Sequence, residues 1–508
     1  MKDVLIGREY EMNLFNKAYQ TEGGVLIGLY GRRRVGKTEF LEHFCMGKPS
    51  IFYPCSSRTN HMQLKYFSEA LYAFSDVYSG LPPFTDWDSA FRFMGRLSSD
   101  EKIVIIIDEF PNMLKSNSDV TSILQNLWDH ELESANIMLI LCGSSISLME
   151  DQLFSTDGDL YGRFYFTYKM LPLSYMDARK FFPDYSDENM VITYAITGGV
   201  PYYLERFKPS KSVERNVKDE ILSPGGRLNN EVAYLMSQEF REVGVFSDIM
   251  ESIAVGCNSS NEICNRLNNK NNFYDGNIKK LIRIDYVEAE YPMFAKVKRT
   301  SSLSQANLII HDGFFRFWFR FVTPNTKELV GKKDDNVDNI WDTYIKDNLH
   351  DFAASAFEDI CIDYMRQLNR CNALPIHFGR IRRWWGKVNV TTEDGKIESK
   401  SEEIDMVAKD KDRNIYIYGE CKFKNEPFNY GQLKALWTKL PRKEEIYYYL
   451  FSLRGFDTEV QKYEGPHLVL VSMHDVFNPP LTVPVKSYDP EVENYDEDED
   501  GSVRESAD

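Results

Sequence analysis

Residues 25–38, VLIGLYGRRRVGKT, decide the fold of the first part of the chain. The apolar run at the start has the length of a strand, and the remainder matches the pattern GxxxxGK[ST] completely. The glycines let the backbone curl so that successive N–H groups point at phosphate oxygens, while Lys37 reaches the β- and γ-phosphates. The following segment, EFLEHFC, has helical apolar spacing, and a helix N-terminus adds partial positive charge. The stretch therefore predicts a P-loop that binds ATP.

This loop also predicts the cofactors and most of their ligands. The hydroxyl of Thr38 is placed to contact Mg²⁺, so ATP and Mg²⁺ are the expected cofactors. The loop residues expected around the nucleotide are Gly31, Arg32, Arg33, Arg34, Val35, Gly36, Lys37, Thr38 and Glu39.

A second apolar strand, KIVIIIDE at residues 102–109, ends in two carboxylates. A continuous apolar run is typical of a parallel strand that is buried on both faces. Downstream of a P-loop, such a strand is expected to be a Walker B strand. Asp108 would then hold Mg²⁺ through water, and Glu109 would polarise the attacking water.

A third strand, NIMLILCG at residues 136–143, is followed by Ser144. If this strand lies between the two Walker strands, Ser144 can sense the γ-phosphate. The alternative is a simple turn into a helix, with Ser145 as its cap. Further on, Arg163 in the segment LYGR is a candidate arginine finger, which would stabilise the transferring phosphoryl group. The alternative for Arg163 is an ordinary surface charge.

Six motifs in this order resemble the archaeal-type ATPases of the AAA-like STAND class: GRE, GRRRVGKT, IIIDEF, CGSS, LYGRF and GGVPYYL. The resemblance covers about residues 1–240 and implies a parallel-sheet P-loop ATPase domain with a helical lid. It implies that Arg8 and Glu9 help to seat the adenine. It also implies that the segment around Pro201 joins the lid to the nucleotide core. As an alternative, Pro201 simply starts a helix.

The middle of the chain, residues 241–325, has three short stretches of helical apolar spacing followed by strand-like sequence. Three helices and a hairpin predict a winged helix, with Lys296, Lys298 and Arg299 in the wing. Such a module commonly places one helix in a DNA major groove. The open alternative is a module that only couples domains. The aromatic segment 312–321 is predicted to be a packed core helix and not a base-stacking platform.

Residues 340–480 hold a second group of chemical residues. Glu358 stands beside an apolar helical face, Asp405 lies near the start of a strand, and the next strand ends in Glu420 and Lys422. Attack on a phosphodiester needs hard cations held by oxygen ligands, so Asp405 and Glu420 are the expected metal ligands. Lys422 would orient the water or stabilise the pentacovalent phosphorus, and Glu358 would hold metal or water.

The segments RWWGK, EIDMVA and GECK resemble the C-terminal domain that accompanies archaeal-type ATPases, which is similar in fold to PD-(D/E)xK restriction endonucleases. Ile404 stands where that pattern has proline, which leaves cleavage open. Two hypotheses follow: an ATPase coupled to a metal-dependent DNA nuclease, or a STAND-type regulatory ATPase whose C-terminal fold binds DNA or a protein without cutting. The nuclease hypothesis predicts that the three carboxylates converge with Lys422 beside them. Without a cation, at least one of these carboxylates should have a raised pKa. The alternative is a set of surface salt bridges, with Lys422 paired to a neighbouring acid and Asp405 facing solvent.

Composition limits the remaining choices. The 508 residues carry a net charge of −17. The sequence contains no run of about eighteen apolar residues, so we expect no membrane span. Eight scattered cysteines without a CxxC pair predict reduced thiols and a cytoplasmic protein. The acidic segment 487–508 is predicted to be a disordered tail. The expected partners are ATP and DNA, with homo-oligomer formation left open. The expected fold class is α/β: a P-loop sheet with a lid, a winged helix and a restriction-endonuclease-like domain.

Overall fold

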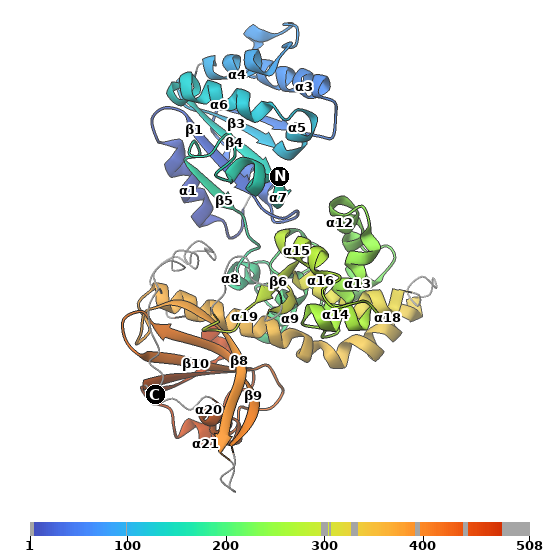
Figure 1. Cartoon of the computed structure of the whole chain (residues 1–508), viewed down its shortest axis with the longest axis vertical. Helices are drawn as coiled ribbons and strands as arrows, with labels where there is room; N and C mark the ends of the chain where they lie inside the picture. Colours follow the sequence, from blue (N-terminus) through green and yellow to red (C-terminus); the bar gives the residue numbers. More distant parts are fainter. Residues whose placement is uncertain are drawn as a thin grey trace. The chain divides into compact units, whose positions relative to one another are not determined.

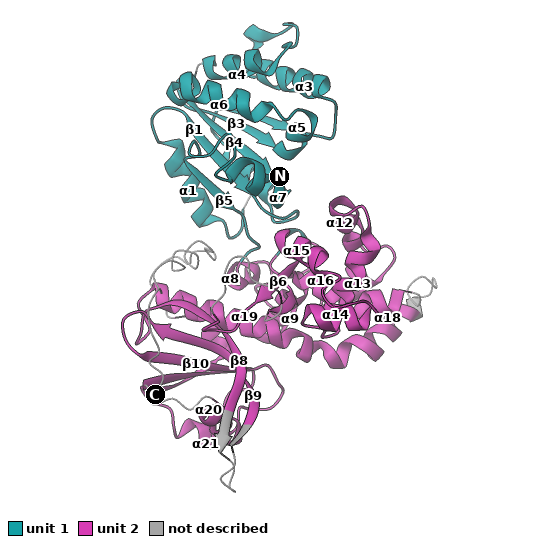
Figure 2. Ribbon diagram, viewed as in Figure 1, with its two compact units in different colours: residues 1–173, 200–202 teal, residues 174–199, 203–508 magenta. Residues whose placement is uncertain are grey.

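The structure is a computed structural model that describes residues 5–97, 99–295, 303, 306–326, 334–391, 397–439 and 445–479. The chain divides into two compact units, residues 1–173 with 200–202 and residues 174–199 with 203–508 (Figure 2). No helix within the described residues is both long enough and apolar enough to cross a membrane. The predicted acidic tail and the predicted wing residues Lys296, Lys298 and Arg299 lie outside the described residues.

The first unit is built on a five-stranded sheet with the order β2-β3-β4-β1-β5 (Figure 1). All four neighbouring pairs are parallel. Strand β4 therefore separates the P-loop strand β1 from the Walker B strand β3, which is the arrangement that the sensing role of Ser144 requires. The strands are β1 (Val25–Tyr30), β2 (Ser50–Pro54), β3 (Ile103–Asp108), β4 (Ile137–Gly143) and β5 (Phe166–Lys169).

Helices cover both faces of this sheet because its central strands are apolar on both sides. Alternate residues of β3 enter different cores: Ile105 packs with Phe67 and Trp87, while Ile106 packs with Phe15 and Phe40. Such continuous burial is the reason that β3 and β4 have no polar face. The helices are α1 (Glu9–Tyr19), α2 (Lys37–Phe44), α3 (Asn60–Tyr72), η1 (Asp76–Tyr78), α4 (Trp87–Arg96), α5 (Phe110–Ser116), α6 (Val120–His130), η2 (Leu132–Ser134), α7 (Ile146–Leu148) and η3 (Met149–Phe154).

The second unit begins with the helices that the sequence assigned to the lid. Helix α9 packs against the later helices α16 and α19, and the hydroxyl of Tyr175 donates to the carbonyl of Val476 at 2.9 Å. The compact division thus falls at residue 173, while the predicted domain boundary at 240 stays a prediction. The helices are α8 (Tyr175–Arg179), α9 (Asp187–Thr197), α11 (Val213–Val217), η4 (Lys218–Leu222) and α12 (Glu231–Glu239), and α10 (Pro201–Leu204) has its first two residues in the first unit.

Three helices and a two-stranded antiparallel sheet follow. Ser259 and Glu262 form a capping box that starts the second of these helices. The aromatic segment after the sheet is buried, with Phe314, Phe315 and Phe317 at 1% exposure or less, which confirms the predicted core helix. The elements are α13 (Val243–Ala254), α14 (Ser260–Arg266), α15 (Asp275–Arg283), β6 (Val287–Glu290), β7 (Asn307–Ile310), α16 (Gly313–Phe317), η6 (Trp318–Val322) and η7 (Thr323–Asn325).

The C-terminal part is a mixed sheet with the order β12-β11-β10-β9-β8, packed against the long helix α19. Strands β8, β9 and β10 are antiparallel, while β10, β11 and β12 are parallel. The elements are α18 (Asp334–Ile340), η8 (Trp341–Ile345), η9 (Lys346–Asn348), α19 (Leu349–Arg370), β8 (Phe378–Thr391), β9 (Ile397–Asp410), β10 (Ile415–Lys422), α20 (Tyr430–Lys439), β11 (Glu445–Ser452), α21 (Thr458–Gln461), β12 (Leu468–Ser472) and α22 (Met473–Phe477).

Candidate functional site

The P-loop connects β1 to α2 through two glycines that no other residue could easily replace. Gly31 has φ 144° and Gly36 has φ 91°, both in the region that favours glycine. A Cβ on Gly31 would lie 2.4 Å from the carbonyl oxygen of Met170, so a side chain there would also clash with the backbone. Between the glycines, Val35 is fully buried and Arg32 is largely buried. The loop is therefore fixed in shape by its neighbours.

The ammonium of Lys37 lies inside this loop. It donates to the carbonyl oxygens of Gly31 at 2.7 Å and Arg32 at 2.9 Å. Burial lowers the pKa of Lys37, although nearby Cys142, Glu109 and Asp108 oppose the shift. Phosphate oxygens would replace the carbonyl acceptors, so the lysine is already placed for the role that the sequence predicts.

Thr38 and Asp108 bring two hard oxygen ligands together. The hydroxyl of Thr38 donates to Oδ2 of Asp108 at 2.9 Å, which joins the start of α2 to the end of β3. The other oxygen of Asp108 accepts from the backbone N–H of Glu109 at 3.0 Å. A hydroxyl and a carboxylate oxygen are the donors that Mg²⁺ prefers, so this pair fits the metal of a bound nucleotide.

Glu109 is held at both carboxylate oxygens. The hydroxyl of Ser144 donates to Oε2 at 2.8 Å, and Arg33 lies 3.8 Å from Oε1. Glu109 also has a positive φ of 53°, which is uncommon for a residue with a side chain. The sheet order explains the contact with Ser144, because β3 and β4 are neighbours and both residues follow their carboxyl ends.

The predicted base-binding residues have different environments. Arg8 is buried and donates to the carbonyl oxygens of Val35 at 2.9 Å and Leu171 at 2.8 Å, and it pairs with Glu11 at 3.0 Å. Arg8 therefore ties the first helix to the P-loop. Glu9 is exposed as the first residue of α1. The contact of both residues with adenine stays a prediction.

The segment around Pro201 touches the P-loop directly. The guanidinium of Arg34, which has φ 74°, stacks 4.0 Å from the ring centre of Tyr202. A Cβ on Gly36 would lie 3.6 Å from the ring of Pro201. Glu39, another predicted nucleotide-site residue, lies in the first turn of α2. The loop and Tyr202 are thus joined by a cation–π contact.

Arg163 is engaged by a carboxylate. Its Nε and NH2 each lie 2.7 Å from an oxygen of Asp129 on α6, which makes a bidentate pair. Its NH1 donates to the carbonyl oxygens of Asp159 and Tyr161. The proposed role as an arginine finger stays a prediction, because it would require this guanidinium to exchange Asp129 for a phosphate.

The C-terminal acids Asp405 and Glu420 lie on neighbouring antiparallel strands, as expected. Met406 of β9 pairs with Gly419 of β10. Asp405 precedes Met406 and Glu420 follows Gly419, so the two acids lie at the next position along the antiparallel pair. The backbone N–H of Cys421 donates to Oδ2 of Asp405 at 2.7 Å. Burial, and then the charges of Glu420 and Glu358, raise the pKa of Asp405 to about 8. This confirms that one of the acids has a raised pKa.

Glu420 is buried and receives two ammonium groups. Lys422 lies 2.7 Å from Oε1, and Lys439 on α20 lies 2.7 Å from Oε2. Burial alone would lower the pKa of Lys422, but the charges of Glu420 and Asp405 outweigh that effect and raise it. Lys422 thus lies where the sequence predicts, whereas Lys439 belongs to no recognised motif.

Glu358 is held by Arg383 of β8. The Nε of Arg383 lies 2.9 Å from Glu358, NH2 lies 2.7 Å from Asp359, and NH1 lies 2.6 Å from Glu290 on β6. Burial raises the pKa of Glu358, although Arg383 opposes the shift. Burial alone would lower the pKa of Arg383, but the charges of Asp359, Glu290 and Glu358 raise it.

The proximity of Glu420 and Glu358 to Asp405 contributes to its raised pKa, while binding of a metal by these three acids stays a prediction. In the part of the chain that the structure describes, no group of three His, Cys, Asp or Glu residues is arranged to hold a metal ion. The reason is that side-chain cations occupy the carboxylates: Arg383 holds Glu358, and two lysines hold Glu420. In this arrangement a divalent cation would have to displace the side-chain cations from Glu358 and Glu420.

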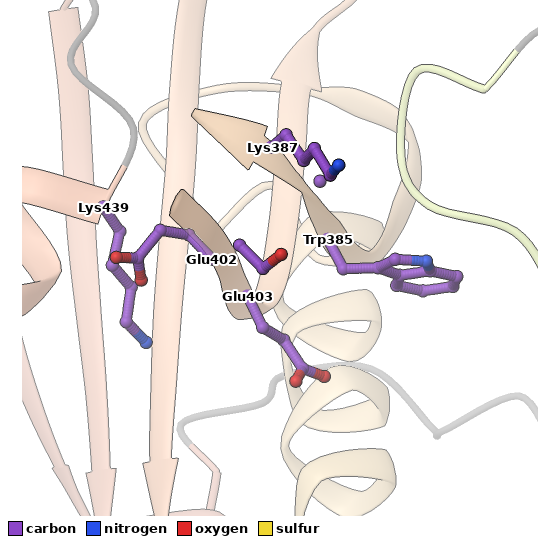
Figure 3. A pocket seen from close by; sticks show the side chains of 7 residues that line it. Trp385, Lys387, Glu402, Glu403 and Lys439 are labelled. Carbon is purple, nitrogen blue, oxygen red and sulfur yellow. The ribbon is translucent and has the colours of Figure 1, made fainter. Parts of the chain in front are cut away.

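A pocket with a volume of about 590 Å³ opens next to these residues (Figure 3). It lies along the β8–β9 ribbon and the end of α20. In Figure 3, Lys439 and Glu402 lie on one side and Trp385 on the other. The lining residues are Trp385, Gly386, Lys387, Ser401, Glu402, Glu403 and Lys439.

The fold and the loop geometry define the first part of the chain as a P-loop ATPase domain, and comparison with known families agrees. Residues 5–207 match a family described as an ATPase domain predominantly from Archaea. Residues 318–435 match a family of archaeal and bacterial proteins of unknown function. An uncharacterised protein of Methanocaldococcus jannaschii is 29% identical over 443 residues, which is 87% of this chain and 92% of that protein.

Solved structures show more distant similarity. A Walker-type ATPase of Pyrococcus abyssi has a TM-score of 0.47 and 17% identity, covering 62% of this chain and 96% of that one. The ORC2 protein of Aeropyrum pernix, in its ADPNP–ADP complexes, has a TM-score of 0.41 and 13% identity, covering 67% of this chain and 96% of that one. At these scores, neither similarity defines the function.

Proposed function

We propose that this chain is an ATP-hydrolysing switch coupled to a C-terminal module that acts on DNA. One observation carries the ATPase part of the proposal. At the carboxyl edge of one parallel sheet, Thr38 contacts Asp108, and Ser144 contacts Glu109, next to the buried ammonium of Lys37. These are the groups needed to bind a triphosphate and to orient water for attack on it.

Each residue has a separate role in this proposal. Lys37 binds the β- and γ-phosphates, and the backbone N–H groups of the loop hold the remaining oxygens. Thr38 and Asp108 would hold Mg²⁺, which neutralises phosphate charge when it is bound. Glu109 accepts a hydrogen bond from the attacking water. Ser144 fixes the direction of the Glu109 carboxylate and is placed to report the γ-phosphate.

The DNA-acting part is supported by the middle and C-terminal modules. Helices α13, α14 and α15 with the β6–β7 ribbon have the element order of a winged helix. The mixed sheet carries Asp405 and Glu420 on adjacent strands, next to Glu358 on α19, in the order of a restriction-endonuclease-like domain. Both assignments are part of the proposal.

A second candidate function is a regulatory ATPase whose C-terminal fold binds DNA or a protein without cutting. The cations that hold Glu358 and Glu420 favour this candidate, because a metal-dependent nuclease needs free carboxylate oxygens. The two candidates share the ATPase site and differ only in the chemistry at the C-terminal acids.

We also propose a cytoplasmic location, which the eight free thiols support. Self-association into a homo-oligomer belongs to the same proposal, since an arginine finger such as Arg163 can act on a neighbouring subunit.

Two assays test the proposal. The full chain should bind ATP by calorimetry and release phosphate, and Glu109→Gln should keep ATP binding while turnover falls about 100-fold. Unchanged turnover in Glu109→Gln would contradict the assigned role. Plasmid and linear DNA are then incubated with Mg²⁺ or Mn²⁺, with and without ATP. Cleavage that disappears in Lys422→Ala supports the nuclease, while binding without cleavage supports the regulatory ATPase.

A further inference from the structure

The single carboxylate of Glu420 contacts two lysine ammonium groups. Each of its oxygens accepts one ammonium at 2.7 Å, so one negative charge lies between two positive charges. Taken alone, this group has one net positive charge beside an open pocket, whose lining also includes Glu402 and Glu403. Nearby Glu402 lies 2.5 Å from Lys400, so part of the pocket's acidity is already neutralised.

The two lysines are not equivalent. Lys422 is on the same strand as Glu420, two residues further along, so its position follows from the pleat of β10. Lys439 is the last residue of α20, and its side chain lines the pocket (Figure 3). A long side chain at a helix end can turn into the pocket without moving the strand.

The pocket beside Lys439 suits the backbone of a nucleic acid. Lys387 is exposed at its rim, Ser401 adds a hydroxyl, and Trp385 adds an aromatic surface. Cationic and hydroxyl groups are the usual contacts to phosphate oxygens, while an aromatic ring can stack on an unpaired base.

We propose that Lys439 is a substrate-binding residue that exchanges Glu420 for a backbone phosphate of DNA. This inference rests on the proposed DNA-acting function. Without DNA, the ammonium of Lys439 contacts Oε2 of Glu420 and excludes other cations from that oxygen. When DNA binds, the ammonium moves to the phosphate and Oε2 becomes free.

The test is Lys439→Met, which keeps the apolar stem and removes the charge. Lys434→Met is the matched control, because Lys434 is exposed on the same helix. Binding of a fluorescently labelled DNA duplex is measured by anisotropy over a range of salt concentrations. Binding of Mn²⁺ to the DNA-free protein is measured by calorimetry.

The proposal predicts changes of opposite sign. Lys439→Met should bind DNA about 5- to 10-fold more weakly at low salt, and the slope of log K against log salt should fall by about 1. It should bind Mn²⁺ at least about 5-fold more tightly, because Oε2 loses its competing cation. Lys434→Met should match the wild type in both assays.

Other results overturn the proposal in distinguishable ways. Weaker binding of both DNA and Mn²⁺ would show that Lys439 only supports the fold. DNA binding by the wild type that is unchanged in Lys439→Met would refute the exchange while leaving the DNA-acting function intact. Absence of Mn²⁺ binding in both proteins would refute the competition for Oε2. Absence of DNA binding by the wild type at every salt concentration would refute the DNA-acting function itself.

Discussion

Ser144 donates its hydroxyl hydrogen to Oε2 of Glu109 at 2.8 Å, from the end of one strand to the end of the next. The backbone N–H of Ser144 points at the same oxygen at 3.4 Å. One serine therefore directs the carboxylate that is proposed to orient the attacking water. The sequence allows a γ-phosphate sensor or a turn residue at Ser144, and the sensing role stays a prediction.

Ser144→Ala should reduce ATP turnover about 10-fold with little change in ATP affinity, because Glu109 would lose the bond that sets its direction. Steady-state phosphate release gives kcat and KM, and calorimetry gives the affinity. Ser145→Ala is the control, since the neighbouring serine has no cap bond to α7. Equal loss of activity in both variants would point to a general effect on the turn.

Lys37→Ala should abolish ATP binding while the fold is kept. The ammonium is buried against two loop carbonyls, so it contributes charge to the phosphate site without holding any helix in place. Calorimetric titration with ATP measures the loss, and circular dichroism checks the fold. ATP binding with unchanged affinity in this variant would remove the P-loop assignment.

Arg163 can be tested together with its partner. If Arg163 is a finger, Arg163→Ala slows turnover, whereas Asp129→Asn leaves it equal or faster because the guanidinium is released. If the pair is only structural, both variants should show the same small loss of stability, about 0–1 kcal/mol. Turnover measured at several protein concentrations shows whether the arginine acts on another subunit.

Asp405 makes stability depend on pH. Its pKa of about 8 in the folded chain lies above the ordinary value near 4, so the folded state holds a proton that the unfolded state has lost between those values. Its contribution to stability is thus fully present below about pH 4 and is lost as pH rises through about 8. Asp405→Asn should therefore raise Tm relative to wild type at about pH 9 and much less at about pH 5. An equal change in Tm at both values would contradict the raised pKa.

Glu290 and Glu288 form a matched pair on β6. Glu290 binds the buried Arg383, whereas Glu288 is exposed. Glu290→Gln should lower the free energy of unfolding by about 1–3 kcal/mol, because Arg383 keeps only two of its three carboxylates. Glu288→Gln should change it by less than about 0.5 kcal/mol. Urea unfolding measures both, and equal effects would show that Arg383 does not depend on Glu290.

The nucleotide site was largely predictable because its residues are close in sequence or end neighbouring strands. Residues 31–38 are contiguous, and the apolar runs before Asp108 and Ser144 predict buried parallel strands. The contact between Ser144 and Glu109 depends on the pairing of β4 with β3. The sequence alone could not show which strands are neighbours. The pairing of Arg163 with Asp129 joins residues 34 positions apart, and no local pattern indicates it.

The C-terminal acids were harder to predict because their partners come from distant segments. Period-two alternation correctly placed Lys422 beside Glu420. Arg383 binds Glu290, which lies 93 residues earlier, and Lys439 reaches Glu420 from a helix 19 residues later. Both cations look like ordinary surface charges in the sequence. The motif indicates the acids but not the cations that hold two of them, and metal binding by the three carboxylates stays a prediction.

The position of Arg383 has a practical consequence for dissecting the protein. Its side chain binds Glu290, and its carbonyl oxygen accepts the backbone N–H of Met293 at 2.9 Å. A fragment that starts at the predicted boundary, residue 340, would therefore lose one of the three carboxylates on Arg383 and the backbone partner of its carbonyl oxygen. Expression of the C-terminal sheet as an independent piece should begin before β6. After limited proteolysis of the intact chain, residues 287–293 should remain bound to the C-terminal sheet.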